Sequence, residues 1–360
     1  MTSSKAAKGR TFATSGPRLR GRWLSECSRL GGWIRFEPKP EDWEAPVTIV
    51  VTEDNFVRAE TNRMLVGLQA QAGGLNRWKH HREPASLDDQ TVIRMNRDTL
   101  YSLAVVNISD GATLTVPDAS GRYLTVMVVN QDHYINRVFT EPGDHPLTTE
   151  EFDTAYVLLA ARVLVDPTNP DDVSQVHAIQ DGFGLSATAN EPLKLPDYDE
   201  ESFTAVRNSV LAEASQGLHG THGMFGKKDE VDPHIHMLGT AAGWGGLPEQ
   251  EAYYESREPK LPVGRYTITV KDVPVDAFWS VTVYGADGFL HPNALDAYSI
   301  NSVAGTKNPD GSITVTFGGT SEDVNPLPLE EGWNYTVRMY RPRPEILDGT
   351  WTFPDLEPPT

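Results

Sequence analysis

The sequence predicts a mostly β protein with a few helices, arranged as two β-sandwiches in series. Short runs of β-branched and aromatic residues alternate with turn signals over residues 91–129. The same pattern returns over residues 265–341, where Asn308-Pro309-Asp310-Gly311 is a strong hairpin turn. The length of 360 residues favours two domains over one, and the 39% of hydrophobic residues can supply their cores.

The first half of the chain begins with a helix and continues with strands. Thr52 is a good N-cap, and the apolar spacing after it predicts a helix over residues 53–71, which ends at Gly73-Gly74. A second helix is expected over 171–183, after a turn. The strands predicted between the helices are residues 91–93, 100–108, 112–116, 123–129 and 156–164. Their spacing is typical of an antiparallel sheet or sandwich.

The second half of the chain starts with a linker and a helix. Residues 186–200 are polar and rich in Pro and Asp, and 202–214 fit a helix. Residues 225–246 are rich in Gly and His and contain Gly243-Trp244-Gly245-Gly246. The strands predicted after them are 265–270, 277–284, 312–317 and 334–341. This series of short strands indicates a jelly-roll-like sandwich.

The charge of the chain argues against two classes of partner. Its formal net charge is −19 and its pI is about 4.9, so nucleic-acid phosphates and anionic membrane surfaces would repel it. No segment approaches the ~18 consecutive apolar residues that a bilayer-spanning helix needs. The single cysteine, Cys27, cannot form an intrachain disulfide and is not expected to be catalytic.

The N-terminal residues 1–45 are basic at first and show no clear periodicity. We expect a flexible extension there. It lacks the apolar region of a secretory signal, which favours a cytoplasmic protein. Export is the alternative if the true start of the protein differs.

Several long stretches resemble two families of unknown function. The resemblance to domain of unknown function 1254 is carried by Arg82–Pro84, Gln90–Ser102 and Val129–Tyr134. The resemblance to domain of unknown function 1214 is carried by Val273–Ser280, Tyr298–Asn301, Phe317–Gly319 and Gly332–Arg343. It implies an immunoglobulin-like β-sandwich followed by a jelly-roll-like β-sandwich, and assembly into a homo-oligomer. It implies no activity, because fold does not fix function.

We therefore expect four parts along the chain. They are the basic extension 1–45, a 1254-like β-sandwich domain at 46–186, a helical and Gly-rich junction at 187–255, and a 1214-like domain at 256–360.

The first group of candidate site residues is Arg94, Asn96, Arg97, Asp98 and Tyr101. Asp98 could act as a general base, and Arg94 or Arg97 could clamp an anionic group in bidentate fashion. Tyr101 could donate a hydrogen bond to a substrate. The alternative is a buried Arg–Asp pair that only fixes loops.

The second group is the run Asn130-Gln131-Asp132-His133-Tyr134. A histidine near its ordinary pKa can shuttle protons, so His133 is the candidate acid–base residue. Its neighbour Asp132 points away from it on an extended chain, which makes Asp98 the candidate residue that orients His133. Asn130 and Asp132 would then contact the substrate. The alternative is a turn whose polar groups satisfy the backbone.

Trp244 and His236 could line a ligand site at the junction of the domains. A Gly-Trp-Gly-Gly turn lets backbone approach a ligand, and Trp244 offers a stacking surface. The alternative is a packed seam. No metal site is expected, because histidines 219, 222, 234 and 236 match none of the usual zinc spacings.

Two functional hypotheses follow. The first is a cofactor-independent hydrolase or lyase acting on a small polar or anionic molecule, with His133 as acid–base, oriented by Asp98, at a hollow near the seam between the sandwiches. The second is a non-catalytic small-molecule-binding or structural oligomeric β protein. Standard signatures of α/β-hydrolases, phosphate-binding loops and dinucleotide-binding folds are absent from the sequence.

Overall fold

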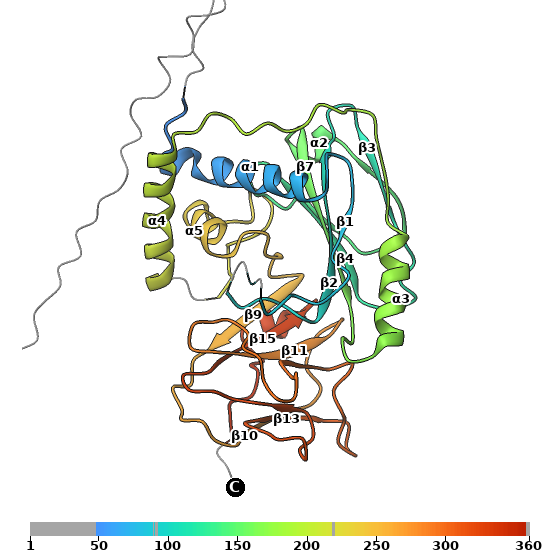
Figure 1. Cartoon of the computed structure of the whole chain (residues 1–360), viewed down its shortest axis with the longest axis vertical. Helices are drawn as coiled ribbons and strands as arrows, with labels where there is room; N and C mark the ends of the chain where they lie inside the picture. Colours follow the sequence, from blue (N-terminus) through green and yellow to red (C-terminus); the bar gives the residue numbers. More distant parts are fainter. Residues whose placement is uncertain (1–47, 89, 91–92, 218–219, 358–360) are drawn as a thin grey trace, which may run out of the picture. The chain divides into compact units, whose positions relative to one another are not determined.

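The computed structural model describes residues 48–88, 90, 93–217 and 220–357 (Figure 1). The predicted extension 1–45, Cys27 and residues 91 and 92 of a predicted strand lie outside these ranges, and Ile93 lies in a turn. The described chain holds more strand than helix, and most of its strands pair in antiparallel sheets.

A five-stranded antiparallel sheet forms the centre of the first domain. Its order is β1 (Lys79–His80), β2 (Thr99–Asn107), β7 (Tyr156–Leu164), β4 (Leu124–Asn130) and β5 (Arg137–Phe139). The strands predicted at 100–108, 123–129 and 156–164 are confirmed to within one residue at each end.

A second sheet faces this one across an apolar core. It consists of β6 (Gly143–Leu147), β3 (Ala112–Val116) and β8 (Gly184–Ala187). Leu114 and Val116 of β3 join Ala104, Val126 and Leu159 of the larger sheet in this core. The short helix α2 (Thr149–Phe152) and helix α3 (Pro170–Asp181) close its edges, with Phe152 and Val176 buried in the same core.

Three helices lie together over the opposite face of the five-stranded sheet (Figure 1). They are α1 (Glu53–Gln71), α4 (Glu200–Gly217) and α5 (Pro233–Gly243). Phe56 of α1, Val210 of α4 and Leu238 of α5 share one apolar cluster. The predictions of helices at 53–71 and 202–214 are confirmed, whereas α5 lies in the segment that we described only as rich in Gly and His.

The second domain also consists of two facing sheets. One has the order β12 (Ser299–Asn301), β11 (Trp279–Tyr284), β15 (Asn334–Tyr340) and β9 (Ala252–Arg257). The other contains β10 (Tyr266–Val270), β13 (Ile313–Phe317) and β14 (Pro326–Leu327), and the short helix α6 (Pro344–Leu347) follows β15. Val281 and Val337 of the first sheet pack against Ile268, Val315 and Phe317 of the second.

The four-stranded sheet turns its other face toward the first domain. Successive side chains of a strand point to opposite faces. Val281 and Val337 therefore face the core of the second domain, while Ser280 and Arg338 face the segment 94–98 that leads into β2. We call this contact zone the seam, and the candidate residues Arg94, Asn96, Arg97 and Asp98 lie along it.

Candidate functional site

Asp98 is a buried carboxylate in the seam. Only 1% of its surface is exposed, and its two oxygens accept hydrogen bonds from Ser280 Oγ at 2.6 Å and Ser299 Oγ at 2.8 Å. Both serines belong to the second domain. Asp98 is thus bonded to strands β11 and β12 and makes no hydrogen bond to His133, contrary to our expectation that it orients that ring.

Arg338 is the buried cation of the same region. Its Nη1 donates to Thr282 Oγ1 at 2.9 Å, and its Nη2 donates to Arg94 O at 2.7 Å and to Tyr284 Oη at 2.6 Å. Burial alone would lower the pKa of Arg338, but Tyr284, Tyr340 and Asp98 raise it above its ordinary value. The guanidinium and the Asp98 carboxylate therefore belong to one polar region in which each group is hydrogen-bonded to protein partners.

The other members of the first group also have protein partners. Arg94 donates to Glu258 Oε1 at 3.0 Å, and Asn96 Nδ2 donates to Tyr340 Oη at 2.5 Å. Arg97 donates to Ala85 O at 2.6 Å and lies over the Tyr298 ring, 4.9 Å from its centroid. Arg94 is thus already paired with a carboxylate, whereas only Nη1 of Arg97 has a hydrogen-bond partner among the described residues, and the anion clamp stays a prediction.

His133 lies against α5 and the turn that follows it. Its ring is fully buried, Nδ1 is 2.8 Å from Thr240 Oγ1, and Nε2 accepts the Gly245 N–H at 3.0 Å. Because Nε2 accepts, the proton of the neutral ring must be on Nδ1. Burial lowers the pKa of His133 well below its ordinary value, and the neighbouring His236 lowers it further.

Four aromatic rings, one of which is His133, form a stacked column. Trp244 stacks on His133 with centroids 5.3 Å apart, His133 on His236 at 5.4 Å, and His236 on Tyr134 at 4.9 Å. His236 is itself fixed between Met224 O at 2.9 Å and Asp132 O at 3.1 Å. The structure thus brings three predicted site residues, His133, Trp244 and His236, into one packed stack.

Asn130 and Asp132 shape the turn that carries His133. Asn130 Oδ1 accepts the backbone N–H groups of Asp132 at 2.9 Å and Tyr134 at 3.0 Å, and His133 takes a left-handed φ of +62° between them. The Asp132 carboxylate turns outward to a bidentate ion pair with Arg58, at 2.5 and 2.6 Å. Both residues have structural partners that account for them.

Arg162 is a functional candidate that the sequence analysis missed. It lies on β7 with 6% of its surface exposed, and its Nη2 donates to Gly245 O at 2.8 Å. The Gly245 peptide therefore joins His133 Nε2 through its N–H to Arg162 through its carbonyl. The predicted residue Tyr101 lies beside it, with its ring centroid 5.2 Å from Arg162 Cζ. The remaining nitrogen, Nη1, is buried without a hydrogen-bond partner among the described residues.

Two tyrosines near Arg162, and one acid near Tyr123, have raised pKa values. Burial raises the pKa of Tyr254 to about 12, and burial also raises the pKa of Tyr123. Burial raises the pKa of Glu251 as well, although Arg341 lowers it, and Glu251 Oε2 has no hydrogen-bond partner in the described part of the chain. These shifts favour neutral side chains around a guanidinium that stays charged.

Comparison with family models identifies both parts of the chain. Residues 75–187 match the family described as protein of unknown function DUF1254, and residues 255–344 match the one described as protein of unknown function DUF1214. The chain therefore contains one DUF1254 domain and one DUF1214 domain. The resemblance expected from the sequence motifs is thereby confirmed. No curated protein matches the chain.

Two solved structures are similar to this DUF1254–DUF1214 chain. The VPA0106 protein from Vibrio parahaemolyticus has 18% identity and a TM-score of 0.64, with 85% of this chain and 98% of that one covered. An uncharacterised protein from Burkholderia cenocepacia has 12% identity and a TM-score of 0.46, with 81% of this chain and 85% of that one covered. The first similarity supports a common fold, and neither supplies an activity.

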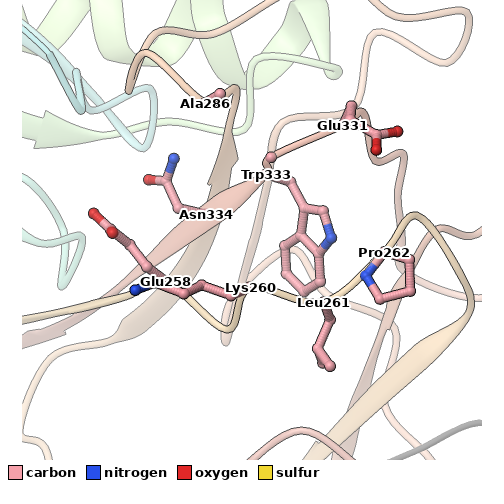
Figure 2. A pocket seen from close by; sticks show the side chains of 9 residues that line it. Glu258, Lys260, Leu261, Pro262, Ala286, Glu331, Trp333 and Asn334 are labelled. Carbon is pink, nitrogen blue, oxygen red and sulfur yellow. The ribbon is translucent and has the colours of Figure 1, made fainter.

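A surface pocket of ≈ 440 Å³ lies on the DUF1214 domain, away from the ring column (Figure 2). Figure 2 shows the Trp333 indole between Asn334 and Pro262, with Glu258 and Lys260 alongside. None of the predicted site residues lines this pocket. Arg94 reaches its edge through Glu258, where its charge is already paired.

The described ranges contain neither a metal-ligand cluster nor a membrane-spanning helix. No group of three or more His, Cys, Asp or Glu side chains there is placed to hold a metal ion. None of the helices in the same ranges has the length and apolar character needed to cross a bilayer.

Proposed function

We propose that this DUF1254–DUF1214 chain binds a small molecule at the seam and does not transform it through His133. The observation that carries this proposal is the state of the His133 ring. An acid–base histidine needs a nitrogen within reach of the substrate, at a pKa near the working pH. Here Nδ1 and Nε2 are both bonded to protein groups, the ring is buried, and its pKa is lowered away from neutrality.

The remaining predicted catalytic groups support a scaffold role in the same way. Asp98 is satisfied by two serine hydroxyls of the other domain, and the nearby Arg338 is satisfied by three acceptors. Buried charges in folded proteins are normally paired or hydrogen-bonded, and such groups fix the arrangement of the elements that carry them. We infer that this cluster holds the two domains in register.

The region around Gly245 supports the binding half of the proposal. Tyr101, Trp244 and Tyr254 are each partly exposed there, whereas Arg162 beneath them is buried. Ligand sites often lie at domain junctions and combine aromatic walls with a few fixed polar groups. The chain of contacts from the ring column through the Gly245 peptide to Arg162 supplies such a polar group on a rigid base.

The proposal is tested by combining a binding screen with a search for turnover. The full chain is screened by thermal unfolding against small polar and anionic molecules, and each compound that raises the melting temperature is incubated with the protein and re-examined by mass spectrometry. We expect the binders to be recovered unchanged. Conversion of a binder by the wild type that is lost in a folded His133→Asn variant would overturn the proposal and restore the hydrolase or lyase hypothesis.

We also propose the finer fold types that the sequence suggested, an immunoglobulin-like sandwich in the DUF1254 domain and a jelly-roll-like sandwich in the DUF1214 domain. Each domain has two sheets that face each other across one apolar core, which supports a sandwich in both cases. An experimental structure in which the strand connections follow neither pattern would refute these assignments.

A further inference from the structure

We propose that Arg162 anchors a small-anion site in the seam and that its ligand carries a carboxylate. This inference rests on the proposed binding function and names the chemical class of the ligand. Nη2 of Arg162 is held by Gly245 O at 2.8 Å, which fixes the orientation of the guanidinium. Nη1 is buried and has no acceptor within the described residues, so one edge of a positioned cation is unused.

The charge of Arg162 is not balanced by a carboxylate in the described structure. None of the ion pairs of the described residues includes Arg162. Its close neighbours are Tyr101, which also makes a polar side-chain contact with the guanidinium, and Tyr254 and Tyr123, whose pKa values are raised by burial. A buried charge without a partner costs several kcal/mol. An ordered water would satisfy the free N–H but not the charge, whereas an anion would satisfy both.

The unused N–H groups and the charge of Arg162 favour a carboxylate. The two N–H groups of Nη1 point apart, so an oxygen of the carboxylate would accept one of them while the anion balances the charge. A phosphate dianion is usually held by several cations or backbone donors, while here one guanidinium is available beside tyrosine hydroxyls. Tyr101, Trp244 and Tyr254 would contact the body of the ligand, which favours a short apolar or aromatic acid.

The contacts of Arg162 indicate a structural role for the ring column. Gly245 has a φ of +79° and presents its N–H to His133 and its carbonyl to Arg162. His133 is in turn fixed by Thr240, whose hydroxyl donates to His236 O at 2.8 Å. This series of bonds is a positioning device, in which the predicted acid–base residue acts on the ligand only through the Gly245 peptide.

The experiment compares acids with their neutral amides on the full chain. Acetate and benzoate are titrated against acetamide and benzamide at constant ionic strength, with thermal unfolding and calorimetry as readouts. Bound ligand raises the melting temperature by mass action. We expect the acids to bind and the amides to bind much less. We expect R162Q to lose about 10- to 100-fold in affinity for the acids, the range of a lost charged hydrogen bond.

Arg257 supplies the matched control. It is also a largely buried arginine, but its guanidinium is fully engaged by Glu255, Phe353 O, Pro354 O and Asp355. We therefore expect R257Q to keep the response of the wild type to carboxylates, whatever its own stability. If R162Q does not fold, R162K retains the charge but loses the planar edge, and we expect it to bind acids about 10-fold more weakly.

The remaining outcomes show whether the anion site or the proposed non-catalytic function has failed. Equal affinity of acids and amides, or unchanged acid affinity in R162Q and R162K, would overturn the anion site while small-molecule binding still stands. No response to any carboxylate would also overturn it. Conversion of a bound acid that depends on His133 would overturn the non-catalytic function and leave the anion site in place.

Discussion

Replacement of His133 by asparagine probes the seam where its contacts are best defined. His133 has a φ of +62°, a conformation that asparagine tolerates better than most residues, so His133→Asn removes the ring with little backbone strain. The Gly245 N–H then loses its acceptor, which costs about 1–3 kcal/mol if nothing replaces it. The loss of the ring between Trp244 and His236 costs about 1–2 kcal/mol more.

The stability that His133→Asn loses relative to the wild type should become smaller as the pH falls. The unfolded ring binds a proton near its ordinary pKa of about 6.5, whereas the folded ring resists protonation because it is buried. Below that pH the unfolded wild type holds more protons than the folded one, so its stability falls by up to ~1.4 kcal/mol per pH unit until the folded pKa is reached. His133→Asn lacks this pH-dependent contribution. The difference in unfolding free energy between the wild type and the variant should therefore become smaller in acid.

Urea unfolding followed by tryptophan fluorescence measures both effects. The wild type and His133→Asn are compared at pH values of about 7.5 and 5.5, on either side of the ordinary histidine pKa. His222→Asn is the control, because the His222 side chain is 89% exposed, and it should change stability by less than ~0.5 kcal/mol. A stability difference between the wild type and His133→Asn that stays constant or grows in acid would refute the assignment of a buried neutral ring.

Three further substitutions test other parts of the structure. Asp98→Asn replaces a buried carboxylate that accepts from Ser280 and Ser299 and should cost about 1–3 kcal/mol in urea unfolding; a neutral or stabilising change would contradict its scaffold role. Above pH 10 the unfolded tyrosines ionise first, so the wild type should lose stability as pH rises, and Tyr254→Phe should reduce that slope in alkaline unfolding curves; an equal slope would place Tyr254 in solvent. Gly318→Ala would bring a methyl group to 2.0 Å from Gly264 O at a φ of +68°, and its melting temperature should fall by several degrees; an unchanged value would mean that this turn relaxes freely.

Local patterns predicted the regular elements well. Strands β3 and β7 match their predicted bounds, and α1 matches its predicted range, because β-branched runs and capping residues act over a few positions. Helix α5 was missed because glycines and histidines obscure its apolar residues, although Asp232 caps it through the N–H groups of His234 and Ile235. The short strand β14 pairs with β13 through only two residues and leaves almost no local signal.

The site was predicted less completely, because its contacts join distant parts of the chain. His133, Trp244 and His236 do lie together in one ring stack, while their role in lining a ligand site stays a prediction. The partners of Asp98 lie 182 and 201 residues further along, and no local pattern points to Ser280 or Ser299. Arg162 did leave a signal, a single arginine inside the apolar strand Tyr156–Leu164, because a charge in such a strand is rarely buried without a purpose.

The bond between Arg338 and the backbone of Arg94 has a consequence for how the protein is made. The two residues are 244 positions apart, and Arg338 belongs to β15, the last strand. A ribosome delivers the DUF1254 part first, and domains generally fold as they emerge. The carbonyl of Arg94 can accept its hydrogen bond from Arg338 only after this final strand has been synthesised. During synthesis the segment around Arg94 is therefore expected to stay exposed to solvent until β15 is added.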